Sequence, residues 1–285
     1  MTPLRKRMFE YMQLRNYSRS TIKSYINMVA AYARYIGKSP DLSDWEAVRE
    51  YMLHLLEERH CSVSHLSQAH SAFKVLFVHV LGWPDAGNQV PRPRKVHTLP
   101  SVMSVSEVER LISSLSNIKH RTLLQVLYGA GLRVSEVVKL RIADIDSERG
   151  VLAVRQAKGF KDRYVPLSAT LLTQMREYWR IYRPSVFLFE RSVSGGPLSV
   201  RTAQAIFQHA KAASGIQKKV SAHTLRHSFA THLLEAGVDL LSIRDQLGHR
   251  SITTTTVYLH LTGSARQTPD LLKALDLKYP DAPIF

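Results

Sequence analysis

A proline-rich segment near residue 90 limits how this chain can fold. Residues 84–101, PDAGNQVPRPRKVHTLPS, contain four prolines. Proline fixes φ and has no backbone N–H, so neither a helix nor an inner strand can run through this segment. We therefore predict a proline-stiffened linker over 84–100 between two domains, 1–83 and 101–285. A chain of 285 residues is long enough for two domains, each with its own core.

The first domain is predicted to be a bundle of about four helices. Apolar residues recur at helical spacing after Ser18, and the first helix precedes Asn16. Ser43 and Glu46 have the spacing of a capping box before another helix. A further helix is predicted to begin at Ser64 and to end at the LGWP sequence.

The second domain is predicted to mix helices with a β-hairpin. Ser104 and Glu107 form a capping-box pattern near its start. The runs VLAVRQA and RYVPLS are typical of short strands and flank KGFKD, residues 158–162, which indicates a hairpin loop. The remainder is predicted to be helical. The expected fold class is mainly α with a small β-hairpin or sheet: an N-terminal helical bundle plus an α+β domain.

The charge of the chain points to a polyanionic partner. The formal net charge is +16, with +4 in residues 1–83 and +10 in residues 101–285. Nucleic acid and an anionic membrane both fit such a charge. No apolar run approaches the roughly 20 residues of a membrane-spanning helix, which favours nucleic acid. Two basic domains on a short linker could close around a duplex as a clamp. The single cysteine, Cys61, suits the reducing cytoplasm.

Three basic side chains are predicted to share one helix face in HTLRH, residues 223–227. His223, Arg226 and His227 stand at i, i+3 and i+4. A solvated basic face would explain this stretch equally well. Arg133 follows a glycine break at the predicted start of another helix, where an anion is favoured, and Glu136 could hold its guanidinium. A surface Arg–Glu pair is the alternative there.

Further candidates are Lys158 in the hairpin loop, His249, and Tyr258 nine residues later. Taken alone, Lys158 is more commonly explained as an exposed hairpin lysine. The histidines have Arg and Tyr as companions rather than Cys or Asp, so no metal site is expected. Cationic donors stabilise the extra negative charge of a phosphodiester under attack. A tyrosine can supply the nucleophile and form a covalent phosphoester.

Four sequence blocks in the second domain resemble the signature motifs of the tyrosine recombinases, the phage-integrase and Xer-like family. They are GLRVSE, AKGFKDRYVPL, HTLRHSFATHLLEAGVDLLSIRDQLGH and TTTTVYLH. They occur in the family's order, and the helical first domain resembles the family's SAM-like core-binding domain. One departure is AKG, where many members have GKG before the lysine loop continues.

The resemblance implies a role for each matching residue. Arg133 and Arg226 would bind the scissile phosphate, with Glu136 as an acidic support. Tyr258 would be the nucleophile that forms a 3′-phosphotyrosine. Lys158 would protonate the 5′-oxygen, with Lys161 as the fallback. His223 and His249 would assist proton transfer and hold phosphate oxygens, whereas His227 is interpreted as structural. Candidate DNA-contacting residues are Arg92, Arg94, Lys95, Lys161 and Arg163.

The same resemblance implies a site-specific recombinase that needs neither ATP, metal nor another cofactor. The expected partner is double-stranded DNA with an inverted-repeat core site, on which four copies of the chain exchange strands through a Holliday junction. A cytoplasmic protein of a bacterium, phage or mobile element is expected. The leucines after Gln267 would form a helical tail that docks on a neighbouring protomer or on its own domain.

Two other functions remain open from the sequence. A topoisomerase IB-like enzyme or a hairpin telomere resolvase would use the same chemistry with a different outcome, which a DNA relaxation assay without paired sites would reveal. A non-catalytic DNA-binding protein on a recombinase scaffold would form no covalent DNA adduct.

Overall fold

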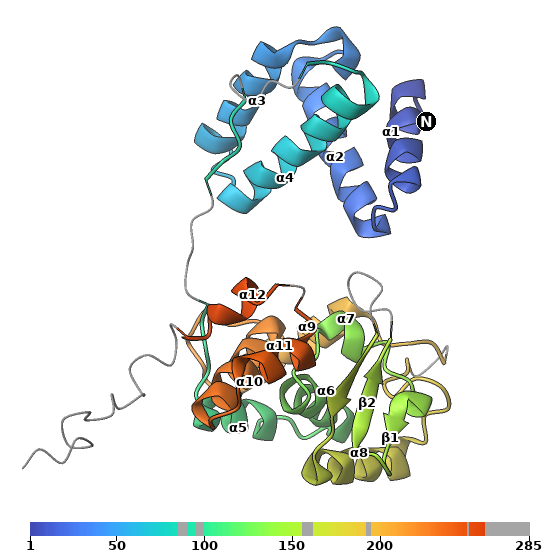
Figure 1. Cartoon of the computed structure of the whole chain (residues 1–285), viewed down its shortest axis with the longest axis vertical. Helices are drawn as coiled ribbons and strands as arrows, with labels where there is room; N and C mark the ends of the chain where they lie inside the picture. Colours follow the sequence, from blue (N-terminus) through green and yellow to red (C-terminus); the bar gives the residue numbers. More distant parts are fainter. Residues whose placement is uncertain (85–89, 95–99, 156–161, 192–194, 250, 260–285) are drawn as a thin grey trace, which may run out of the picture. The chain divides into compact units, whose positions relative to one another are not determined.

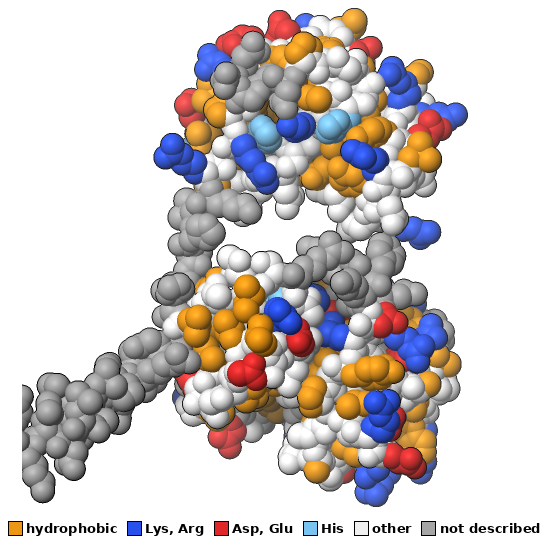
Figure 2. Space-filling view, viewed as in Figure 1, with side chains coloured by type: hydrophobic (Ala, Val, Ile, Leu, Met, Phe, Trp, Pro, Cys, Tyr) orange, Lys and Arg blue, Asp and Glu red, His pale blue; other side chains and the backbone are white. Residues whose placement is uncertain are grey.

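The computed structural model describes residues 1–84, 90–94, 100–155, 162–191, 195–249 and 251–259. The chain forms two compact units, Met1–Thr98 and Leu99–Phe285 (Figure 1). The boundary falls inside the predicted linker, whose limits at 84 and 100 remain a prediction. Lys and Arg side chains are present on the surfaces of both units (Figure 2). Within the described ranges, no helix has the length and apolar composition needed to span a membrane.

The N-terminal unit is helical, as the apolar spacing predicted. Its elements are α1 (Pro3–Leu14), α2 (Arg19–Ile36), η1 (Pro40–Leu42), α3 (Trp45–Glu57), α4 (Val63–Phe73) and the π-helical η2 (Lys74–Val80). Aromatic rings fill its core, with Tyr32 packed 5.2 Å from Phe73 and 5.3 Å from Tyr51 between centroids.

Side-chain caps set the helix starts in this unit. Ser18 accepts a hydrogen bond from the Thr21 amide, in agreement with the predicted start of α2. The capping box predicted at Ser43 is wrong, because the carboxylate of Asp44 accepts from the Ala47 amide and caps α3 instead. The helix predicted from Ser64 begins earlier, since Ser62 is its N-cap. In both places a neighbouring Asp or Ser competes for the same cap, so spacing alone misplaces the start.

The C-terminal unit combines helices with one small sheet. Its elements are α5 (Val105–Ser113), α6 (Ile118–Gly129), α7 (Val134–Val137), η3 (Ile142–Asp144), β1 (Ile145–Asp146), β2 (Val151–Val154), β3 (Arg163–Pro166), α8 (Ala169–Tyr182), α9 (Val200–Ala213), α10 (Ala222–Glu235), α11 (Leu240–Leu247) and α12 (Thr253–Thr256). The capping box of Ser104 and Glu107 is confirmed at the start of α5.

The sheet confirms the predicted hairpin and adds one short strand. The strand order is β1-β2-β3 with antiparallel pairing, and Val154 pairs with Arg163 at the loop end of the hairpin. The loop residues 156–161 lie outside the described residues. Buried side chains of the sheet, such as Leu152 and Val165, join the same core as Leu171 of α8. The hairpin is therefore anchored on one face by the main core.

Helix α6 lies at the centre of this unit. It contacts α5, α7, α8, α9 and α10, and its Leu123, Leu124 and Leu127 are fully buried. A smaller core joins α10 to α11 through Leu234, Ile243 and Leu247, together with Tyr258 after α12. The C-terminal helices are thus held by a cluster of their own.

Two glycines turn the chain at the places where its carbonyls approach α10. Gly131 follows α6 with φ +58, and Gly248 ends α11 with φ +63. Left-handed φ values favour glycine because a Cβ clashes with the backbone. At Gly131 a Cβ would also lie 2.3 Å from Cδ1 of the Phe229 ring. This glycine is therefore required both for its conformation and for the close approach of α10.

We predict that Gly131→Ala destabilises the C-terminal unit more than a substitution at another left-handed glycine. The φ penalty is roughly 1–2 kcal/mol, and crowding adds about 1–3 kcal/mol. Gly215→Ala is the matched control, because its φ is +69 and nothing lies within 4 Å of the added Cβ. Thermal and urea unfolding would measure both variants. Equal losses would contradict the close approach at Phe229.

Candidate active site

The buried guanidinium of Arg226 lies at the centre of the candidate site. The side chain is 1% exposed on α10. Its Nη1 donates to the carbonyl of Gly131 at 2.8 Å, and its Nη2 donates to the carbonyl of Leu247 at 2.5 Å. Burial, assisted by the charge of Arg133, lowers the pKa of Arg226 to about 9, and nearby Glu136 opposes that fall. The group is therefore positively charged at neutral pH, and a buried charge needs a counter-charge.

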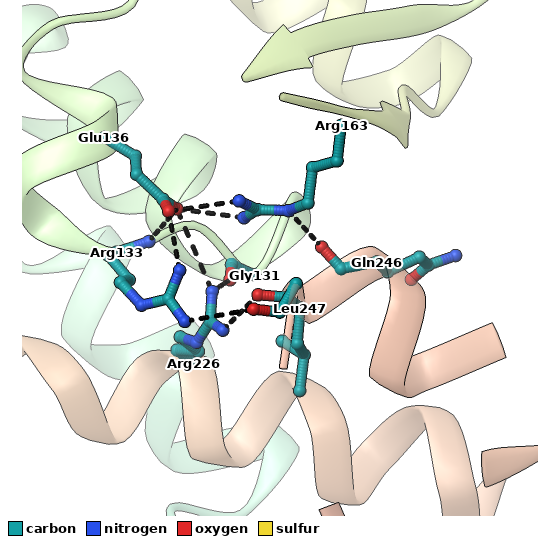
Figure 3. Close-up of polar contacts among 8 residues, drawn as sticks. Gly131, Arg133, Glu136, Arg163, Arg226, Gln246 and Leu247 are labelled. Carbon is teal, nitrogen blue, oxygen red and sulfur yellow. Dashed lines mark hydrogen bonds and ion pairs between the residues drawn. The ribbon is translucent and has the colours of Figure 1, made fainter. Parts of the chain in front are cut away.

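Glu136 supplies that counter-charge for three arginines (Figure 3). Its carboxylate accepts from Arg133 Nη1 at 2.7 Å and lies 3.9 Å from Arg226 Nη1. It also accepts a pair of bonds from Arg163, at 3.1 and 2.9 Å. Burial alone would raise the pKa of Glu136, but the hydrogen bonds and charges of Arg163 and Arg133 outweigh it and lower the pKa to about 2.

Arg133 is held at the N-cap of α7, the position that the sequence predicted. The backbone N–H of Arg133 donates to Glu136 at 2.9 Å, so the same carboxylate fixes both its backbone and its side chain. Its side chain is 22% exposed, whereas that of Arg226 is 1% exposed. The expectation that Glu136 holds this guanidinium is met by these contacts. Arg133 is consequently the more accessible of the two arginines.

Arg163 differs from its sequence-based interpretation as a DNA contact. It projects from β3 onto Glu136, and its Nε donates to the carbonyl of Gln246 at 2.7 Å (Figure 3). Its side chain is 10% exposed. These protein contacts occupy the guanidinium, so the structure places Arg163 as a bridge between the hairpin, Glu136 and the end of α11.

Three histidines gather beside the arginines. His223 and His227 lie about one helical turn apart on α10. Their ring centroids are 4.6 Å apart, which confirms the shared face predicted for them. His249 follows α11, and its Nδ1 lies 2.9 Å from the Thr255 hydroxyl. Burial is the main cause that lowers the pKa of His223, and the charge of Arg226 adds to it. The same two causes lower the pKa of His249 to about 4. The histidines are thus predominantly neutral at pH 7.

Tyr258 lies in the turn after α12 and is 2% exposed. Its ring packs nearly parallel to that of His249, with a centroid distance of 6.5 Å. Burial raises the pKa of the phenol, although Arg226 and Arg133 act in the opposite direction. The hydroxyl lies 3.0 Å from Nδ1 of His227. The interpretation of His227 as structural missed this contact, although the i+4 spacing from His223 placed it on the same face.

The remaining candidates fall elsewhere. Lys158, Lys161 and Lys95 lie outside the described residues. Arg92 and Arg94 are exposed in the N-terminal unit, where Arg92 Nε is 3.5 Å from the Ser67 hydroxyl. The predicted tail after Gln267 also lies outside the described residues. Thr255, which contacts His249, was not among the predicted site residues, because the run of four threonines does not distinguish one from another.

The assembled groups have the chemistry to act on a phosphodiester. Two guanidiniums lie beside a tyrosine hydroxyl and three imidazoles, so anion-binding donors and a nucleophile occur together. Within the described residues, no three His, Cys, Asp or Glu side chains are grouped to hold a metal ion.

We predict that Glu136→Gln destabilises the protein by about 3 kcal/mol near pH 7. That value follows from the fall in pKa from 4.5 to about 2. Because the folded pKa is depressed, the stabilisation is present above about pH 4.5 and is lost as the pH falls toward about 2. The difference between wild type and variant in urea unfolding should shrink over that window. Asp245→Asn, which removes an exposed pair with Arg244, should cost at most about 1 kcal/mol. A difference that does not change with pH would contradict the role of Glu136.

Comparisons with known proteins show which proteins the chain resembles. Residues 101–264 match the phage integrase family, and residues 4–85 match the phage integrase N-terminal SAM-like domain. A putative integrase/recombinase of Sinorhizobium fredii is 42% identical, covering 92% of this chain and 85% of that protein. The tyrosine recombinase XerA of Pyrococcus furiosus is 35% identical, covering 88% of this chain and 87% of that protein.

Solved structures show the same fold. A crystal structure of XerA recombinase matches with a TM-score of 0.55 and 30% identity, covering 97% of this chain and 99% of that chain. A lambda integrase tetramer bound to a Holliday junction matches with a TM-score of 0.74 and 19% identity, covering 89% of this chain and 75% of that chain. The chain thus belongs to the phage integrase family of tyrosine recombinases, enzymes that break and rejoin DNA strands.

Proposed function

We propose that this site-specific recombinase cleaves DNA with Tyr258 and holds the scissile phosphate with Arg133 and Arg226. The observation that carries the proposal is that Arg133 and Arg226, from distant parts of the sequence, meet at Glu136, while the hydroxyl of Tyr258 lies 3.0 Å from His227, the neighbour of Arg226 on α10. A structural arginine–carboxylate cluster would not require a tyrosine hydroxyl and three histidines beside it.

The proposed cleavage step is a transesterification. The Tyr258 oxygen attacks phosphorus and loses its proton, while the bond from phosphorus to the 5′-oxygen breaks. The 5′-oxygen leaves with a proton from Lys158, and the DNA 3′ end remains attached as a phosphotyrosine. Arg133 and Arg226 stabilise the negative charge that develops on the non-bridging oxygens, with His223 and His249 nearby. The phosphoester retains the energy of the broken bond, so rejoining needs no cofactor.

We infer double-stranded DNA with an inverted-repeat core site as the substrate. Among proteins of this fold, XerH was crystallised on a palindromic substrate and lambda integrase as a tetramer on a Holliday junction. By this likeness, four copies of the chain would exchange strands through such a junction. A protein acting on cellular DNA would work in the cytoplasm, and a bacterium, phage or mobile element is the expected source.

The N-terminal unit offers a second DNA-contacting face in this proposal. A hollow there is lined by basic and aromatic side chains, and Figure 2 shows histidine beside Lys and Arg side chains on this unit. Its lining includes Tyr17, His70, Lys74, His79 and Arg92. Basic side chains bind phosphates, and aromatic rings pack against sugars and bases. Both units would then contribute to a clamp on the duplex.

Tyr258→Phe should retain DNA binding and lose the covalent DNA adduct. The change removes the nucleophilic oxygen and keeps the ring. The substrate is a nicked duplex whose site has been enriched from a randomised pool by covalent capture on the wild-type protein. Tyr128→Phe is the matched control, because it removes a half-buried tyrosine hydroxyl that is hydrogen-bonded to His232 at 2.8 Å. An adduct that persists in Tyr258→Phe would assign the nucleophile to another residue, with Tyr279 the nearest candidate in sequence.

Lys158→Ala should cleave ordinary DNA slowly and recover most of its activity on DNA with sulfur in place of the bridging 5′-oxygen. An alkoxide leaving group needs a proton, which is worth roughly 10² to 10⁴ in rate. A thiol leaving group, with a pKa of about 8.5, can leave without that proton. Arg133→Ala should gain far less from sulfur because Arg133 would hold a non-bridging oxygen. If the sulfur substrate restores cleavage by Lys161→Ala and not by Lys158→Ala, the general acid is Lys161. If sulfur restores neither variant, the residues of this loop do not protonate the leaving group.

A further inference from the structure

His227 is the residue that meets the hydroxyl of Tyr258. Nδ1 of His227 and the phenolic oxygen are 3.0 Å apart, and the ring centroids are 5.8 Å apart. Tyr258 is 2% exposed, so bulk water has little access to its hydroxyl in this conformation. His249 stacks on the phenol ring, but its own Nδ1 contacts Thr255. The geometry therefore distinguishes His227 from the other histidines of the site.

We propose that His227 is a catalytic residue that accepts the proton of the Tyr258 hydroxyl during DNA cleavage and returns it during rejoining. This inference rests on the proposed function, because it requires Tyr258 to be the nucleophile. In cleavage, the bond between oxygen and phosphorus forms as the phenolic proton moves to Nδ1. In rejoining, the 5′-hydroxyl attacks phosphorus, the tyrosine oxygen leaves, and the proton on Nδ1 returns to it.

The charges around His227 suit a proton acceptor that acts only when DNA is present. His223 and Arg226 lie beside it on α10, and Tyr258 contacts it from the turn after α12. His249 interacts electrostatically with His227 and with Arg133 of the same cluster. Burial, followed by the charges of His223 and Arg226, lowers the pKa of His227 to about 4. The imidazole is therefore neutral at pH 7. When its proton is on Nε2, the lone pair on Nδ1 is available to accept the phenolic proton.

A bound phosphate would change this balance. Its negative charge beside Arg133 and Arg226 offsets the positive charge that opposes protonation of His227. Proton transfer from the phenol then becomes more favourable at the step where the tyrosine attacks. Without DNA, the same arrangement keeps the phenol protonated and buried. Loss of the proton is thereby linked to the arrival of the substrate.

The test compares single-turnover cleavage by wild type, His227→Asn and His227→Gln. In Asn the amide oxygen can occupy the place of Nδ1 and keep a hydrogen bond, but it cannot take the proton. The captured nicked duplex is used in two forms, one with oxygen and one with sulfur at the bridging 5′ position. His232→Asn is the matched control, since His232 lies on the same helix and its Nδ1 is paired with the Tyr128 hydroxyl. DNA binding is measured separately by gel shift.

We expect both His227 variants to bind DNA normally and to cleave roughly 10²-fold more slowly or worse, as for other lost acid–base groups. His232→Asn should cleave at the wild-type rate. Sulfur should not restore the His227 variants, because their defect lies on the nucleophile. On the sulfur substrate, the rate of His227→Asn should increase about tenfold per pH unit between about pH 7 and 9, as the phenol must ionise unaided. The wild-type rate should change little over the same range.

Several results would overturn the proposal. Cleavage by His227→Asn at the wild-type rate would show that no proton acceptor is needed there. Rescue of that variant by sulfur would place His227 on the leaving-group side. Loss of DNA binding in both variants would assign His227 a structural role. A wild-type protein that forms no adduct with any duplex of the pool would instead refute the proposed function itself, which separates the two failures.

Discussion

One buried carboxylate and three guanidiniums determine how the C-terminal unit is built. Glu136 accepts from Arg133 and Arg163 and lies 3.9 Å from Arg226. Three positive charges on one negative charge leave the cluster cationic. Such an excess is unfavourable inside a protein, and a bound phosphate would relieve it. In the proposed function, this incomplete charge balance would favour the binding of a phosphate.

The surrounding backbone completes the coordination of Arg226. Its guanidinium donates hydrogen bonds to the carbonyls of Gly131 and Leu247, which lie at two left-handed turns at the ends of α6 and α11. Arg163 adds a bond to Gln246, so the hairpin and the end of α11 are tied to the same centre. Displacing any of these segments would move the guanidinium, which explains why a small sheet, a short helix and two glycines meet there.

The proposed nucleophile, Tyr258, is held by a different kind of contact. Tyr258 packs in a small apolar core with Leu234, Ile243 and Leu247, and its hydroxyl meets His227. Burial keeps both groups neutral, because the charged form of each is poorly solvated. Arg226 of the cationic centre and His227 of the neutral pair are neighbours on α10, so in the proposed mechanism phosphate binding would be linked to the state of the phenol.

The sequence by itself determined the helical first domain, the hairpin, the capping of α5 and the pairing of Arg133 with Glu136. Helical spacing, turn composition and the four recombinase-like blocks are local properties, so they can be recognised without coordinates. Only the tertiary structure decided what Arg163 and His227 touch. Both contacts join segments far apart in the chain, 27 residues for Arg163 with Glu136 and 31 for His227 with Tyr258. A basic side chain such as Arg163 has the same local pattern whether it faces DNA or a buried carboxylate, and only the contacts of β3 with Glu136 and α11 distinguish the two.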